Sequence, residues 1–253
     1  MNRSLALALA LFCCSCSSSS RQSQNSQLTV AAAANLTDIF NNLGLQFEKQ
    51  TGIHPVFSFA STAQLARQIE NAAPFDVLAA ADAEHVDELD RKGLLTPGSR
   101  AVYAIGVLAL WIPPGSKASI SRIEDLTSPE VKVIAVAKPE LAPYGAASVE
   151  ALRASGIWEQ VKGKVVYAEN ISMARQYGAS SNADAVFTAW SLVLHDAGKV
   201  IQVDEKLHRP IVQELGIVAA SPRQAEARRF TDFLLRGPGR DALARSGYRV
   251  PAK

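Results

Sequence analysis

Short apolar, β-rich runs alternate with helical patterns along almost the whole chain. Residues 28–33, 54–59 and 76–81 predict strands, and an amphipathic helical pattern follows each of them. This alternation is typical of sheets with parallel strands whose faces are covered by helices. A chain of 253 residues has room for two such α/β units.

Two longer apolar runs, residues 102–112 and 211–219, exceed the usual length of a strand. We interpret them as crossovers that carry the chain into a second unit and back again. The sequence therefore predicts a discontinuous lobe 1, residues 28–107 and 213–253, and a lobe 2, residues 108–212. Ligands of such folds bind in the crevice at the carboxyl ends of the strands, here between the lobes.

The first 27 residues have a different character. A short positive start precedes an apolar run over residues 5–14, and a Ser-rich, then Gln/Asn-rich stretch follows. We expect residues 1–27 to be a secretory signal segment and a tether, since the apolar run is too short to span a membrane. Two outcomes stay open: cleavage into the periplasm, or lipid attachment through Cys14 or Cys16.

Cysteine and charge exclude several functions. All three cysteines precede residue 28, so the body offers no disulfide, thiolate metal site or cysteine nucleophile. Of the 26 basic residues, Arg3 and Arg21 also precede residue 28, which leaves 24 against 24 acidic ones. A neutral body without basic clusters predicts no nucleic-acid partner.

Four predicted strand-to-helix junctions share one chemistry. Their residues are mostly small or bear a hydroxyl or amide group. Each junction begins a helix, and none contains Lys or Arg. Helix N-termini present unpaired N–H groups and the positive end of the helix dipole, so several converging on one point would bind an anion without formal positive charge. The junctions are residues 34–37, 61–63, 143–145 and 170–172.

A site built of donors favours an oxyanion that carries no proton at neutral pH, such as sulfate or molybdate. A protonated anion such as hydrogen phosphate would set its O–H against another donor. The alternative interpretation is that these residues are ordinary N-caps, with Asn35 capping its helix and Tyr144 packed in a turn.

At these residues the chain resembles the molybdate-binding receptors of ABC importers. The matching segments include LTVAAAANLTDIF, FASTAQLARQIENAAPFDVLAAAD, AKPELAPYGAASVEAL and VVYAENISMARQ, and together they span nearly all of residues 28–248. The resemblance implies a two-lobed periplasmic binding protein fold of type II, with two Rossmann-like lobes that close around the anion. It also implies a transmembrane permease and an ATPase as partners, a periplasmic address, no cofactor, molybdate or tungstate as ligand, and a monomer.

The resemblance assigns ligand contacts residue by residue. Thr62 is the favoured hydroxyl, and many relatives have Tyr just after the strand at 183–188, where this chain has Ala189. Tyr144 on another loop would then supply the phenol. The implied contacts are Ala34, Asn35, Ser61, Thr62, Tyr144 and the backbone N–H of Ile171.

Other classes of protein are less well supported. Asp76 and Asp82 are the carboxylates a hydrolase would pair, but both flank one strand and read as loop caps. Nucleophile-elbow, P-loop and dinucleotide-binding motifs are missing, and the four histidines lack metal-ligand spacing. A receptor for another oxyanion, such as sulfate or thiosulfate, is the main alternative. The signal segment argues against the effector domain of a transcription regulator.

Overall fold

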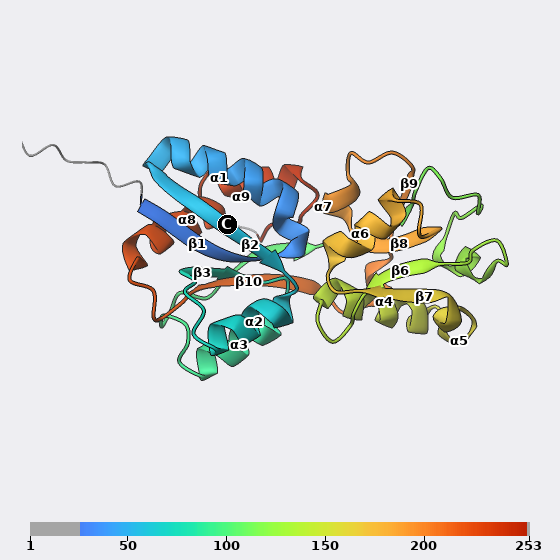
Figure 1. Ribbon diagram of the computed structural model, residues 1–253, viewed down its shortest axis with the longest axis horizontal. Coiled ribbons are helices and arrows are strands. Elements are labelled where there is room, and N and C mark those ends of the chain that lie inside the picture. Colours follow the sequence, from blue (N-terminus) through green and yellow to red (C-terminus); the bar gives the residue numbers. More distant parts are fainter. Residues whose placement is uncertain (1–25, 252–253) are drawn as a thin grey trace, which may run out of the picture.

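The computed structural model describes residues 26–251 as two α/β lobes side by side (Figure 1). The signal segment, the three cysteines and most of the tether lie outside the described residues. No helix within residues 26–251 is long and apolar enough to cross a membrane.

The first lobe is built on a five-stranded sheet in the order β2-β1-β3-β10-β4. Strands β1, β2 and β3 run parallel, whereas β10 pairs antiparallel with both β3 and β4. The strands are β1 (Ser26–Ala33), β2 (Ile53–Ala60), β3 (Val77–Ala79), β4 (Ala101–Gly106) and β10 (Ile211–Ile217). Its helices are α1 (Thr37–Thr51), α2 (Thr62–Glu70), α3 (Glu84–Arg91), α8 (Gln224–Leu235) and α9 (Pro238–Arg245), with a 3-10 turn η1 (Ala34–Leu36).

The second lobe repeats this plan with the sheet order β7-β6-β8-β5-β9. Strands β6, β7 and β8 are parallel, and β5 runs antiparallel to β8 and β9. The strands are β5 (Leu108–Ile112), β6 (Ile134–Ala137), β7 (Val165–Ala168), β8 (Ala185–Ala189) and β9 (Lys199–Gln202). The helices are α4 (Pro143–Ala154), α5 (Trp158–Val161), α6 (Ile171–Ala179) and α7 (Trp190–Val193), with 3-10 turns η2 (Ile123–Thr127), η3 (Lys162–Lys164) and η4 (Glu205–Leu207).

Helix α1 illustrates how the sequence pattern sets the packing. Phe40, Leu43 and Phe47 recur at helical spacing and are fully buried against the first sheet. Phe47 meets Phe230 of α8 edge to face at 5.2 Å, which joins the two ends of the chain in one core. The helix ends at Gly52, whose φ of 71° supplies the left-handed turn.

The predicted α/β class with two crossovers is confirmed, but two details differ. The run at 102–112 is two strands in different sheets, because β4 pairs with β10 whereas β5 pairs with β8 and β9. Of the second run, 211–219, residues 211–217 form β10 in the first sheet, so the return crossing falls just before this strand, at Arg209-Pro210. These crossing strands make each sheet mixed rather than parallel. The division into residues 28–107 with 213–253 and residues 108–212 stays a prediction.

Candidate oxyanion-binding site

The four junctions meet at one cavity between the lobes. It is lined from the first lobe by the ends of β1 and β2, by η1, by the start of α2 and by the loop after β3, and from the second lobe by the starts of α4 and α6. The cavity is small, at about 10 Å³, which is enough for about one water molecule. Its lining residues are Ala33, Ala34, Asn35, Ala60, Ser61, Thr62, Ala81, Ala142, Pro143, Tyr144, Asn170 and Ile171.

All six residues assigned by resemblance are among these lining residues. Ala34 and Asn35 come from η1, Ser61 and Thr62 from the start of α2, and Tyr144 and Ile171 from the second lobe. The residues are 1–5% exposed, so each is enclosed by protein. The structure brings the six together; whether they bind a ligand stays a prediction.

The lining carries no formal charge. None of its residues is Asp, Glu, Lys, Arg or His. The helices α2, α4 and α6 contribute their first residues, whose backbone N–H groups have no acceptor within the helix. Pro143, at the first position of α4, has no backbone N–H, so the first backbone donor of this helix is the N–H of Tyr144. The arrangement can therefore hold an anion by dipoles and hydrogen bonds alone.

The hydroxyls of Ser61 and Thr62, at the start of α2, have different hydrogen-bond partners. Ser61 Oγ donates to Gln64 Oε1 at 2.8 Å, and the same oxygen accepts from Ser61 N at 3.2 Å. This is the helix cap that the alternative interpretation expected. Thr62 Oγ1 instead accepts from the backbone N–H of Ala81 at 3.0 Å. Its own proton is thereby left for a further acceptor, which favours Thr62 over Ser61 as the hydroxyl donor.

Asn35 does not cap α1. Its Nδ2 donates to Gln213 Oε1 and to Tyr248 Oη, each at 3.0 Å. Tyr248 Oη donates in turn to the backbone carbonyl of Asn35 at 2.8 Å, and Ser191 Oγ donates to Tyr248 at 3.0 Å. Asn35 Oδ1 is buried without a hydrogen-bond partner among the described residues. Asn35 is thus locked by chain segments far away in sequence.

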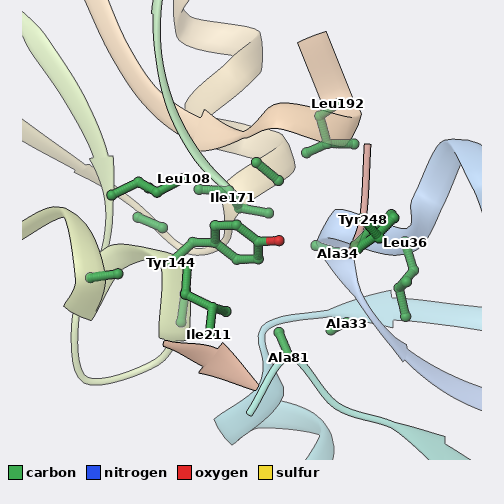
Figure 2. Close-up of a cluster of buried hydrophobic side chains, with 14 of the residues drawn as sticks. Ala33, Ala34, Leu36, Ala81, Leu108, Tyr144, Ile171, Leu192, Ile211 and Tyr248 are labelled. Atoms are coloured by element: carbon green, nitrogen blue, oxygen red, sulfur yellow. The ribbon is translucent and has the colours of Figure 1, made fainter. Parts of the chain in front are cut away.

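Tyr144 is turned inward. Its ring is 1% exposed and its oxygen accepts from Gln213 Nε2 at 3.0 Å. Figure 2 shows the ring near Ile171 and Ile211, with its oxygen on the side where Ala34 lies. Burial raises the pKa of Tyr144 well above its ordinary value, so the phenol keeps its proton at neutral pH.

The fourth junction combines a cap with a contact between the lobes. Asn170 Oδ1 accepts from Met173 N at 3.0 Å, which is an ordinary N-cap and leaves the N–H of Ile171 at the cavity. Ser172 Oγ donates across the cleft to the carbonyl of Ala34 at 2.8 Å. A second contact between the lobes joins Ala63 N to Leu141 O at 3.2 Å.

Three buried polar residues around the site escaped the sequence analysis: Gln213, Tyr103 and Tyr248. Gln213 stood out only as an amide inside the apolar run 211–219. Asp76 and Asp82, the carboxylates considered for a hydrolase, do not share a site. Asp76 accepts from Thr29 N and Ser221 Oγ, whereas Asp82 accepts from His85 N. In the described part of the chain no three His, Cys, Asp or Glu residues gather as metal ligands.

The fold and this cavity define a class of protein, and comparison with known proteins identifies it. The chain belongs to the bacterial extracellular solute-binding protein family, whose model matches residues 28–249. It is 34% identical over 228 residues to the molybdate-binding protein ModA of Azotobacter vinelandii, which covers 88% of this chain and 90% of that protein. The ModA of Rhodobacter capsulatus is 31% identical over 226 residues, or 88% of each chain.

Solved structures agree with this assignment. The periplasmic molybdate-binding protein of Azotobacter vinelandii superposes with a TM-score of 0.83 at 31% identity, over 89% of this chain and 100% of that one. The sulfate-binding protein SubI of Mycobacterium tuberculosis matches with a TM-score of 0.73 at 14% identity, over 89% of this chain and 87% of that one, and shows a shared fold alone. The resemblance to the molybdate-receptor family and the two-lobed fold it implies are confirmed.

Proposed function

We propose that this protein captures molybdate outside the cytoplasmic membrane and delivers it to an ABC permease. The observation that carries the proposal is the uncharged cavity between the lobes, where the starts of three helices and one 3-10 turn converge. The similarity to named molybdate-binding proteins over nearly the whole body supports the choice of anion. Tungstate has the same shape and charge, so we expect it to bind as well.

The donors available to the anion come from both lobes. The first lobe offers the Thr62 hydroxyl, and the second offers the phenol of Tyr144 and the N–H of Ile171. Hydrogen bonds from N–H and O–H groups to a charged oxygen are about twice as strong as neutral ones. Because Tyr144 keeps its proton, it donates rather than repels. A fully ionised tetrahedral oxyanion fits this donor set, and a protonated anion would place its O–H against one of the donors.

Binding requires the lobes to move. A cavity of about 10 Å³ admits about one water molecule, so an oxyanion can enter only when the lobes stand further apart than they do in this structure. The bonds from Ser172 to Ala34 and from Ala63 to Leu141 hold the lobes together here and must lengthen or break to admit it. Closure excludes water, which strengthens each hydrogen bond to the anion. We infer that the closed form is the one a permease recognises.

The remaining parts of the proposal concern cellular location and partners. We infer that residues 1–27 direct export and that the protein works in the periplasm, as a monomer, with a transmembrane permease and its ATPase. Lipid attachment through Cys14 or Cys16 stays open beside simple cleavage. The chain acts as a receptor rather than as an enzyme, and it needs no cofactor.

Calorimetric titration of the purified protein with molybdate, tungstate, sulfate and phosphate tests the proposal. We expect molybdate and tungstate to bind at least about a hundredfold more tightly than sulfate or phosphate, a difference of roughly 2.7 kcal/mol. Sulfate binding as tightly as molybdate would leave an oxyanion receptor but refute the molybdate assignment. If none of the four anions binds, the four junctions are helix caps and nothing more.

A further inference from the structure

One buried amide connects both halves of the site. Gln213 lies on β10, is fully buried, and does not line the cavity itself. Its Oε1 accepts from Asn35 Nδ2 at 3.0 Å and from Tyr103 Oη at 2.8 Å. Its Nε2 donates to Tyr144 Oη at 3.0 Å. The side chain thus contacts two residues that line the cavity, one from each lobe.

The bond to Tyr144 fixes the direction of a proton. An amide nitrogen only donates, so the phenol oxygen of Tyr144 is the acceptor in this pair. The single proton of the phenol must then point away from Gln213. Tyr144 Oη has no other hydrogen-bond partner within residues 26–251, and Tyr144 lines the cavity.

We propose that Gln213 is a positioning residue for oxyanion binding, because its amide makes the phenol of Tyr144 an obligate donor to the anion. The inference rests on the proposed function of the cavity. Gln213 belongs to β10 of the first lobe and Tyr144 to α4 of the second, so the bond between them joins the two lobes in this structure. The phenol proton is therefore directed by a residue of the opposite lobe.

The space for this contact depends on a glycine. A Cβ at Gly106 would lie 2.2 Å from Tyr144 Oη and 2.7 Å from Gln213 Nε2. Gly106 ends β4 at the first crossing, and its φ does not require glycine. Its lack of a side chain is what lets the amide and the phenol meet at this point.

A purely structural role for Gln213 is the competing explanation, since a buried amide with three partners also stabilises the fold. The two explanations differ in one respect. If Gln213 acts through the hydroxyl of Tyr144, removing that hydroxyl first should remove most of the effect of changing Gln213. A structural role would lower affinity equally with or without the hydroxyl.

A double-mutant cycle separates them. Molybdate affinity is measured by calorimetry for the wild type, Gln213→Met, Tyr144→Phe and the double variant. Met matches Gln closely in shape but has no N–H. We expect Gln213→Met alone to weaken molybdate binding about tenfold relative to the wild type. Added to Tyr144→Phe, it should weaken binding less than about twofold relative to Tyr144→Phe alone. Gln202→Met, which removes an exposed amide from β9, is the matched control and should bind as the wild type does.

The outcomes are distinct. Equal losses in both backgrounds would overturn the inference, as would a Gln213→Met protein that binds as tightly as the wild type or more tightly. Should Gln213→Met fail to fold, Gln213→Leu carries the same cycle with an apolar side chain at the same buried position. A wild-type protein that binds no molybdate would refute the proposed function and the inference with it; an additive cycle with intact wild-type binding refutes the inference alone.

Discussion

Two hollows lie side by side between the lobes, and they differ in charge. The cavity described above has no ionisable side chain except Tyr144. The neighbouring groove, of about 300 Å³, shares Ala81, Ala142 and Pro143 with it but is lined by charged residues. These are Asp82, Glu84, His85, Glu140, Glu150 and Arg209.

Four of the charged residues of the groove pair with one another. His85 Nδ1 lies 2.7 Å from Asp82 Oδ2, and Arg209 donates to Glu150 from Nε at 2.8 Å and from its backbone N–H at 2.9 Å. Arg209, the arginine that lines the groove, is therefore paired with a carboxylate, whereas the cavity holds donors that have no counter-charge. The comparison teaches that the proposed anion site offers helix starts and hydroxyls rather than cations.

Asn35→Asp should lower molybdate affinity more than any other substitution considered, because it places a carboxylate in the uncharged cavity. Asp cannot donate to Gln213 or Tyr248, and its charge would face the anion. An uncompensated buried charge costs about 3–5 kcal/mol, so we expect a loss of molybdate affinity of about a thousandfold by calorimetry. The control is Asn42→Asp, an exposed position on α1, which should bind normally. Equal affinity of Asn35→Asp and wild type would show that Asn35 does not face the ligand.

Gly106→Ala should have the next largest effect. The added methyl group overlaps Tyr144 Oη, and overpacking of this kind costs about 1–3 kcal/mol. We expect the phenol to leave its position and molybdate affinity to fall about a hundredfold. Gly163→Ala is matched to it, since a Cβ there meets nothing within 4 Å. If Gly106→Ala binds molybdate like Gly163→Ala, the phenol is not a ligand contact.

Thr62→Ala tests the hydroxyl donor of the first lobe. The substitution removes one bond to a charged ligand and also the acceptor of the Ala81 N–H. We expect roughly a tenfold loss of affinity or somewhat more, from about 1.5–3 kcal/mol. Thr62→Ser keeps the hydroxyl and should stay within about threefold of the wild type. A Thr62→Ser protein as weak as Thr62→Ala would assign the loss to packing instead.

The smallest expected effect is a pH dependence of stability, which should arise in the groove and not in the cavity. The hydrogen bond to Asp82 raises the pKa of His85 above its ordinary value. The pair therefore stabilises the fold below about pH 6.5, and this contribution is lost as pH rises through the raised pKa. In thermal unfolding, His85→Gln should lower the free energy of unfolding more at about pH 6 than at about pH 8.5, by less than about 1 kcal/mol in either case.

Two controls accompany that measurement: a histidine outside the groove, and molybdate binding at the cavity. His195→Gln, which changes an exposed histidine for which the described residues offer no ion pair, is the matched variant. Molybdate affinity of the wild type should stay flat over the same range, since no group in the cavity titrates there. An affinity that follows the titration of His85 would mean that the groove takes part in binding.

The sequence predicted the junctions well because their chemistry is local. Ser61 before α2 and Asn170 before α6 are caps that neighbouring residues explain. It could not predict how Asn35 is held, because its partners Gln213 and Tyr248 lie 178 and 213 residues away. The same limit hid the division of the run 102–112 into β4 and β5, since pairing partners, rather than hydrophobicity, decide where one strand ends.

A crystal structure of the protein with molybdate tests the central claim most directly, because anomalous scattering from molybdenum locates the ion. The account predicts the ion in the uncharged cavity, with oxygens about 3 Å from Tyr144 Oη, Thr62 Oγ1 and the N–H of Ile171. Molybdenum in the charged groove beside Arg209, with the cavity unoccupied, would contradict it.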